Sequence, residues 1–155
     1  MLRIRKITID DVPTLRELIQ ELAEFERKPD EVAITDENLA RDGFGPEPKF
    51  RGLIAEWDGQ PVAYAIFFGF YSTWKGAGLF LEDLFVREAY RGRGIGKALL
   101  AEVARTAQNE SCPTMRWEVL DWNAPAIEFY KSLGAEVSPE WRLVTLDANA
   151  IKRFK

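Results

Sequence analysis

The sequence predicts an α+β layered domain. Strand-like and helix-like segments follow one another without regular alternation, which is typical of this class. The chain has 155 residues, of which 46% are apolar and 30% charged, a balance that suits one core of ordinary size. No linker or internal repeat stands out, so we expect a single domain over residues 1–155.

The N-terminal part of the chain predicts one strand and two helices. Residues 2–5 alternate apolar and basic side chains, as a half-buried strand does. Asp10 or Asp11 is a candidate cap for a first helix, and Thr35 for a short second helix over residues 36–42. The first helix has apolar residues at helical spacing: Val12, Leu15, Leu18, Ile19, Leu22 and Phe25.

Three strands follow, over residues 50–57, 61–70 and 79–87. Asp58-Gly59 between the first two is a hairpin signal. Residues 71–78 are expected to form a longer connection.

The remaining elements are a helix over residues 96–109 and strands over residues 115–120 and 141–146. A further helix begins after Asn123, which can cap it, and ends at Gly134.

The composition of the chain excludes several kinds of partner and catalytic site. The net charge is −4 without a long basic run, so we expect no nucleic-acid partner. The absence of histidine excludes Ser-His-Asp and Cys-His catalysis, and with one cysteine a zinc site is not expected, although carboxylates could hold magnesium. Short apolar runs and the lack of a signal peptide predict a cytoplasmic protein without a membrane partner.

The strongest motif is Arg91-Gly92-Arg93-Gly94-Ile95-Gly96-Lys97. Glycines let backbone amides turn toward one point, and the following helix N-terminus adds a positive dipole, so the segment favours phosphate. A Walker A loop would need glycine at Arg91 and Ser or Thr at Ala98. A dinucleotide fingerprint starting at Gly92 would need glycine at Lys97. The pattern Arg/Gln-x-x-Gly-x-Gly/Ala fits, and a glycine turn without a ligand is the alternative.

This pattern resembles the coenzyme A pyrophosphate loop of the GNAT acetyltransferase superfamily. Further segments resemble its diamine acetyltransferase family, whose members acetylate spermidine and spermine or, more similar to this chain, thialysine. They occur in the family's order at residues 21–26, 42–45, 71–76, 81–83, 90–92, 120–123 and 129–135. The resemblance implies the GNAT fold, a mixed and mostly antiparallel central sheet with flanking helices and a splayed strand pair near a bulge.

The resemblance also implies acetyl-CoA as co-substrate, no metal, and three groups of site residues. The expected coenzyme contacts are Leu84, Phe85, Val86, Arg91, Gly92, Arg93, Gly94, Ile95, Gly96, Lys97, Asn123, Ala124, Pro125 and Ala126. The expected substrate contacts are Phe25, Glu26, Glu82, Arg116, Trp117 and Glu118. The expected catalytic residues are Tyr130 and Glu82.

The expected mechanism is direct attack of a neutral amine on the thioester. Tyr130 is assigned as the acid, and Glu82 as the base or the carboxylate that holds a water. Each assignment has a structural alternative. Periodicity alone would place Tyr130 in the core, the adjacent carboxylates Glu82 and Asp83 could be edge charges, and Asn123 could be only a helix cap. Phe25 and Trp117 could also be core residues.

The substrate expected from the resemblance is a small cationic amine. Polyamine-acetylating members tend to carry aspartate where Ser72 stands, which favours thialysine or a lysine- or ornithine-like amino acid. Diamines and polyamines are the alternative, followed by protein acetylation and a non-catalytic acyl-CoA-binding module. Family members are commonly homodimers, so a homodimer is expected.

Overall fold

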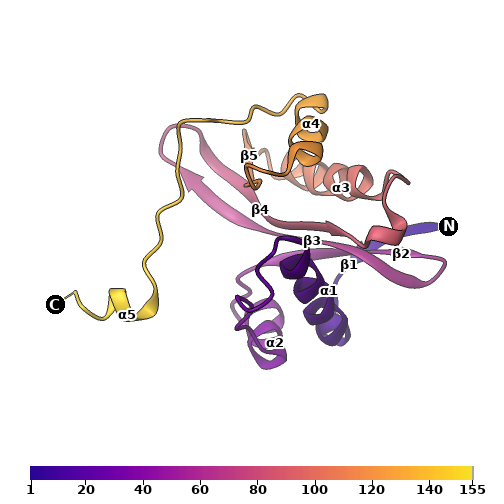
Figure 1. The fold of residues 1–155 in the computed structure, drawn as a ribbon, viewed down its shortest axis with the longest axis horizontal. Coiled ribbons are helices and arrows are strands. Elements are labelled where there is room, and N and C mark those ends of the chain that lie inside the picture. The colour runs from indigo at the N-terminus through magenta and orange to yellow at the C-terminus, as the bar shows by residue number, and fades with distance from the viewer. Residues whose placement is uncertain (155) are drawn as a thin grey trace. The chain divides into compact units, whose positions relative to one another are not determined.

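The computed structural model describes residues 1–154 and contains a five-stranded sheet in the order β1-β2-β3-β4-β5 (Figure 1). The first four strands pair antiparallel, and β4 and β5 pair in parallel, so the predicted mixed, mostly antiparallel sheet is confirmed. The strands are β1 (Leu2–Lys6), β2 (Arg51–Trp57), β3 (Gln60–Ser72), β4 (Gly76–Val86) and β5 (Met115–Arg116).

Helices cover both faces of the sheet. The helices α1 (Val12–Phe25) and α2 (Asp36–Phe44) pack on one face, and α3 (Ile95–Asn109) packs on the other (Figure 1). The first cluster includes Leu15, Leu18, Ile54, Tyr64 and Phe85. The second includes Leu79, Leu81, Ile95, Leu99 and Val103. Short 3-10 turns, Ile9–Asp11 and Glu88–Tyr90, precede α1 and the glycine-rich loop.

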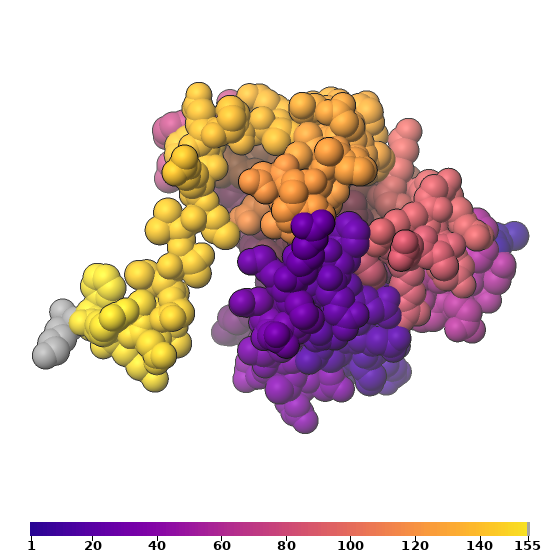
Figure 2. Space-filling view, viewed as in Figure 1, coloured from indigo at the N-terminus to yellow at the C-terminus, as the bar shows by residue number. Residues whose placement is uncertain are grey.

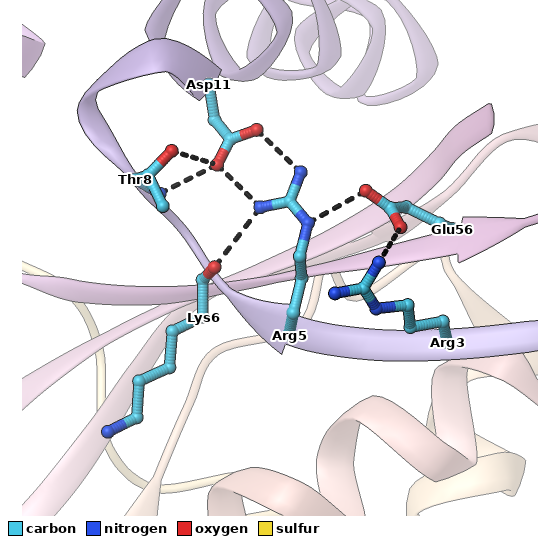
Figure 3. A network of polar contacts seen from close by, with 6 residues as sticks. All are labelled: Arg3, Arg5, Lys6, Thr8, Asp11 and Glu56. Atoms are coloured by element: carbon cyan, nitrogen blue, oxygen red, sulfur yellow. Dashed lines mark hydrogen bonds and ion pairs between the residues drawn. The ribbon is translucent and has the colours of Figure 1, made fainter. Parts of the chain in front are cut away.

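A charged network fixes the start of α1 to the sheet (Figure 3). The guanidinium of Arg5 donates to both oxygens of Asp11, at 2.7 and 2.8 Å, and to Glu56 at 2.8 Å. Asp11 also accepts the backbone N–H of Thr8 at 2.7 Å. Asp11 stands at the N-cap position of α1, but its side chain makes no cap bond there. The predicted cap position is therefore confirmed for Asp11, but its carboxylate makes no capping bond because Arg5 and Thr8 occupy it.

A β-bulge interrupts the pairing of β3 with β4. Ile66 lies opposite Asp83 and the next residue, Phe67, lies opposite Leu81, which leaves Glu82 as the extra residue. One inserted residue exchanges the faces to which all later side chains of the strand point. The bulge therefore separates β4 into two halves with opposite alternation.

The hairpin between β3 and β4 is longer than predicted. Tyr71 pairs with Ala77 and Ser72 with Gly76, so the expected connection over residues 71–78 is wrong. The hydroxyl of Ser72 accepts the backbone N–H groups of residues 74 and 75 at 3.2 and 3.1 Å, which closes a tight turn. Cross-strand pairing extends the ladder through a segment whose glycines lower its strand propensity.

The strand β5 is shorter than the predicted segment 115–120. It pairs with β4 only at Leu79 with Met115 and at Phe80 with Arg116. After Arg116 the two strands separate. Residues 117–120 have the composition of a strand, but they form no ladder with the other described strands. This separation is the splayed strand pair that the resemblance predicts.

The chain divides into two compact units, Met1–Glu118 and a second that begins at Val119. The second unit contains α4 (Ala124–Ser132), capped by Asn123, and α5 (Ala148–Ile151). The strand predicted over residues 141–146 is wrong, because these residues pair with no strand. Trp141, Leu143 and Val144 are 77%, 75% and 88% exposed. In the space-filling view the segment forms a narrow strip of yellow atoms (Figure 2).

The Arg5–Asp11 contact predicts a pH-dependent stability. The hydrogen bonds from Arg5 lower the pKa of Asp11 from 3.8 to about 2. A lowered pKa stabilises the folded chain above the unfolded value, and this contribution disappears as the pH falls from about 4 to about 2. Asp11→Asn should therefore lower the free energy of unfolding by about 2 kcal/mol at pH 7.

Urea unfolding at pH 7 and pH 2.5 measures this difference. The exposed neighbour supplies a matched control, since Asp10→Asn should change stability by less than about 0.5 kcal/mol. An Asp11→Asn variant as stable as the wild type at pH 7 would contradict the assignment.

Candidate active site

The glycine-rich loop presents the N-terminus of α3 without a side-chain cap. Gly92 and Gly94 have φ angles of 75° and 77°, in the left-handed region that glycine adopts readily. Gly94 is the N-cap residue of α3 and, as glycine, offers no side chain to bond the first-turn N–H groups. Arg93 and Lys97 are exposed beside them. Uncapped amides, a helix dipole and two cations suit a pyrophosphate group.

Among the described residues, β4 has no ladder partner after Phe80 on the edge that faces β5. Arg87 N–H donates to Val62 on β3 at 2.9 Å. Because backbone groups alternate in direction along a strand, those of Leu84 and Val86 point to the opposite, open edge. An extended ligand arm can pair with such an edge as an added strand does. Phe85 differs, since its backbone points toward β3 and its side chain is buried, 6% exposed.

Arg91 connects the loop to the end of α1. Its guanidinium lies 4.5 Å from the ring centre of Phe25 and 5.8 Å from that of Phe85, distances typical of cation–π contacts. Its Nε donates to the carbonyl of Val86 at 2.9 Å. Phe25 is 39% exposed and belongs to neither apolar cluster. The alternative that Phe25 is a core residue is therefore wrong.

Carboxylates from three segments influence one another electrostatically near the bulge. Burial raises the pKa of Glu82, and the charges of Asp83 and Glu118 raise it further. Burial also raises the pKa of Glu26, the charge of Lys28 opposes this, and the charge of Glu82 adds to it. The structure thus brings together the predicted substrate residues Glu26, Glu82 and Glu118. Their combined negative charge favours a cationic ligand.

Asp83 belongs to the same group, although a regular strand would direct it to the face opposite to Glu82. It is linked to the buried Tyr64, whose hydroxyl donates to Asp83 Oδ2 at 2.8 Å. Burial raises the pKa of Asp83, the Tyr64 hydrogen bond lowers it, and Glu26 raises it. Neither residue was predicted as functional. The one sequence signal that could have indicated this pair is Tyr64 itself, a polar hydroxyl within the apolar sequence of β3, which pairs with β4.

The predicted substrate residues on β5 and after it have different surroundings. Arg116 is exposed, and its guanidinium lies 4.8 Å from the ring centre of Phe70. Trp117 is partly buried and packs against the α3 cluster, as its core alternative predicts.

The remaining predicted residues belong to the second unit. Asn123 Oδ1 accepts the backbone N–H of Ala126 at 3.4 Å, so it caps α4 as expected. Pro125 lies in the first turn beside Ala124, where proline costs no helical hydrogen bond. Tyr130 lies on α4, with its ring 5.5 Å from that of Phe129.

Residues 1–154 contain no group of three or more His, Cys, Asp or Glu side chains arranged to hold a metal ion. None of the helices in this part of the chain has the length and apolarity needed to cross a membrane.

A sheet edge without a full ladder, beside an uncapped and glycine-rich helix N-terminus, is the arrangement that the resemblance predicts for an acyl-CoA-dependent transferase. Comparison with known families agrees. Residues 12–135 match the model of the acetyltransferase (GNAT) family, and the chain belongs to this family. It is therefore an acyltransferase, and the GNAT fold implied by the sequence resemblance is confirmed.

Curated relatives with high similarity to this chain are named for the amine that they acetylate. Thialysine N-epsilon-acetyltransferase from Bos taurus is 39% identical, over 97% of this chain and 95% of that protein. The Mus musculus protein of the same name is 42% identical, over 86% of this chain and 84% of its own. L-ornithine N5-acetyltransferase from Arabidopsis thaliana is 29% identical, over 97% and 86%.

Solved structures show the same fold. An integron cassette protein of V. cholerae has a TM-score of 0.80 at 23% identity, covering 97% of this chain and 95% of that one. An aminoglycoside N-acetyltransferase solved in complex with CoA has a TM-score of 0.74 at 23% identity, covering 95% and 94%.

The loop geometry predicts how two glycine substitutions differ. Gly94 and Gly59 have φ angles of 77° and 82°, and an added Cβ at either would meet no atom within 4 Å. Gly94→Ala and Gly59→Ala should therefore each cost about 1 kcal/mol of stability through backbone strain alone. Only Gly94→Ala changes the amides at the start of α3, so only it should weaken CoA binding, by about tenfold.

Calorimetric titration with CoA, alongside thermal unfolding of both variants, measures the two effects. Equal CoA affinity in the two variants would show that the loop does not hold the coenzyme.

Proposed function

We propose that this chain transfers an acetyl group from acetyl-CoA to the primary amine of a small cationic metabolite, such as thialysine or a lysine- or ornithine-like amino acid. The observation that carries the proposal is the carboxylate group of Glu26, Glu82, Asp83 and Glu118 near the bulge of β4. Relatives that cover most of the chain support it, since their names specify amino acids with a side-chain amine.

The chain has groups suited to each part of the coenzyme. The uncapped amides of α3, with Arg93 and Lys97, fit the pyrophosphate, and the open edge at Leu84 and Val86 fits the pantetheine arm. The helix cap around Asn123, followed by Ala124, Pro125 and Ala126, is the further coenzyme contact we propose. When bound, acetyl-CoA supplies a thioester that a neutral amine can attack without help from a metal.

In this proposal Glu82 accepts a proton and Tyr130 donates one. A substrate amine has a pKa near that of lysine, about 10.4, so it arrives protonated. Glu82, or a water that it holds, accepts this proton. Burial and the neighbouring carboxylates raise the pKa of Glu82, which makes it a stronger base. Tyr130 Oη gives a proton to the departing thiolate, and the second proton that the nitrogen loses as the amide forms restores the Tyr130 hydroxyl.

Ser72 supports an amino acid rather than a long polyamine as substrate. It is 7% exposed, and its hydroxyl is engaged with two backbone N–H groups of the hairpin turn. It therefore supplies no negative charge for a distant second ammonium. Diamines and polyamines remain the second candidate, because the carboxylate group would attract any cationic amine.

We further propose that residues 1–155 act as one catalytic domain in the cytoplasm and form a homodimer. The exposed apolar side chains of Trp141, Leu143, Val144 and Leu146 support the dimer, because association would remove them from water. Acetylation of proteins and a non-catalytic role rank lower, since the candidate acid and base are both present.

An amine panel tests the substrate assignment. Thialysine, ornithine and lysine should release free thiol from acetyl-CoA faster than putrescine, spermidine or a lysine-containing peptide, at equal concentration. The reason is that the carboxylates near Glu82 match one nearby ammonium, while residue 72 offers no second anion. Faster turnover of spermidine would favour the polyamine alternative, and peptide turnover alone would favour protein acetylation.

Replacing Tyr130 tests the acid. Tyr130→Phe keeps the ring on α4 and removes the hydroxyl, so kcat should fall by about a hundredfold while CoA affinity stays within twofold. Tyr90→Phe is the control, since it also removes one hydroxyl but lies outside the proposed machinery. A Tyr130→Phe enzyme with wild-type kcat would exclude the assigned role.

A further inference from the structure

The fully buried Tyr64 and the half-buried Asp83 form a polar pair beside an otherwise apolar layer. Tyr64 is 0% exposed, and its hydroxyl donates to Asp83 Oδ2 at 2.8 Å. Its ring lies 6.4 Å from that of Phe85, its register partner on β4. A carboxylate in such surroundings is costly to keep ionised unless hydrogen bonds or a cation compensate it.

The bulge determines where this pair lies. The apolar cluster around α1 and α2 contains Tyr64 and Phe85, whereas Leu81 and Leu84 pack in the cluster of α3. In a regular strand Leu81 and Phe85 would share a face. The extra residue Glu82 reverses the alternation, so the hydrogen bond to Tyr64 forms on the side of α1. Asp83 is thereby directed toward the segment that ends in Glu26.

We propose that Tyr64 is a positioning residue for acetylation, which holds the Asp83 carboxylate near Glu26 and Glu82, where it contributes to binding the ammonium group of the substrate. This inference rests on the proposed function and assigns roles to two residues outside the predicted site. Tyr64 acts through Asp83 and does not itself touch the substrate.

The groups around Asp83 determine its response to pH. Tyr64 faces it from β3, Glu26 from the end of α1, and Glu82 adjoins it on β4. Burial and Glu26 both raise the pKa of Asp83, and among these influences the Tyr64 hydrogen bond lowers it. Burial also raises the pKa of Tyr64 well above its usual value, so the hydroxyl keeps its proton. Loss of the hydroxyl would therefore leave Asp83 protonated up to a higher pH.

A purely structural role makes a different prediction. If the hydrogen bond only stabilised the pairing of β3 with β4, Tyr64→Phe would lower the melting temperature without changing the response to amine. If the pair positions charge for the substrate, the amine response changes as well.

The test compares Tyr64→Phe, Asp83→Asn and the double variant with Tyr90→Phe as the hydroxyl-deletion control. Tyr64→Phe should raise the KM for amine about tenfold, the scale of one hydrogen bond to a charged group, while the KM for acetyl-CoA stays within twofold. The acid limb of its kcat/KM profile should move to higher pH. Asp83→Asn keeps an oxygen for Tyr64 and removes the charge, so it should raise the KM for amine at least as much.

The double variant should resemble Asp83→Asn alone, because the hydroxyl acts only through that carboxylate. Tyr64→Phe with wild-type amine KM and pH profile would overturn the inference, whatever its melting temperature. Should Tyr64→Phe fail to fold, a wild-type amine KM in Asp83→Asn would overturn it equally. A wild-type protein that turns over no amine would instead contradict the proposed function, and with it the ligand of this pair.

Discussion

Strand β4 is paired along one edge and almost unpaired along the other, and the candidate site depends on this asymmetry. The antiparallel ladder with β3 runs from Gly76 to Val86, whereas β5 pairs only at Leu79 and Phe80. A complete ladder on both edges would satisfy every backbone group and leave nothing for a ligand. The early separation instead leaves an open edge that ends near the glycine-rich loop.

The bulge in β4 determines which polar groups meet beside this edge. One extra residue at Glu82 directs Asp83 to the side of Tyr64. Arg91 joins the two halves of the site, since it contacts Phe25 beside Glu26 and bonds to Val86 at the open edge. Arg91 therefore links the loop proposed to bind pyrophosphate to the segment that carries the carboxylates proposed to bind the amine, although the two parts favour ligands of opposite charge.

Local sequence signals predicted most elements, and non-local pairing accounts for the errors. The glycine-rich loop, the Thr35 cap and the periodicity of α1 are encoded within a few residues, and the structure contains each. The segment 141–146 has the composition of a strand, but composition does not specify a pairing partner. Glu82 was selected from the sequence because its loop and strand resemble a family. Tyr64 was not, because its hydrogen bond to Asp83 depends on a register shift that only the assembled sheet reveals.

The pKa values of Glu26, Glu82 and Asp83 are all raised, so the charge of a bound ligand affects the stability of the folded site. A carboxylate with a raised pKa is destabilising when ionised in the folded state, because burial and like charges oppose its charge. A cation beside these groups removes part of that repulsion, and a neutral ligand cannot. In the proposed mechanism the acidic arrangement thus selects a protonated amine for binding, whereas the attack on the thioester needs the neutral form. The proposed base, Glu82, belongs to the same carboxylate group and resolves this conflict, since it can first hold the ammonium and then accept its proton.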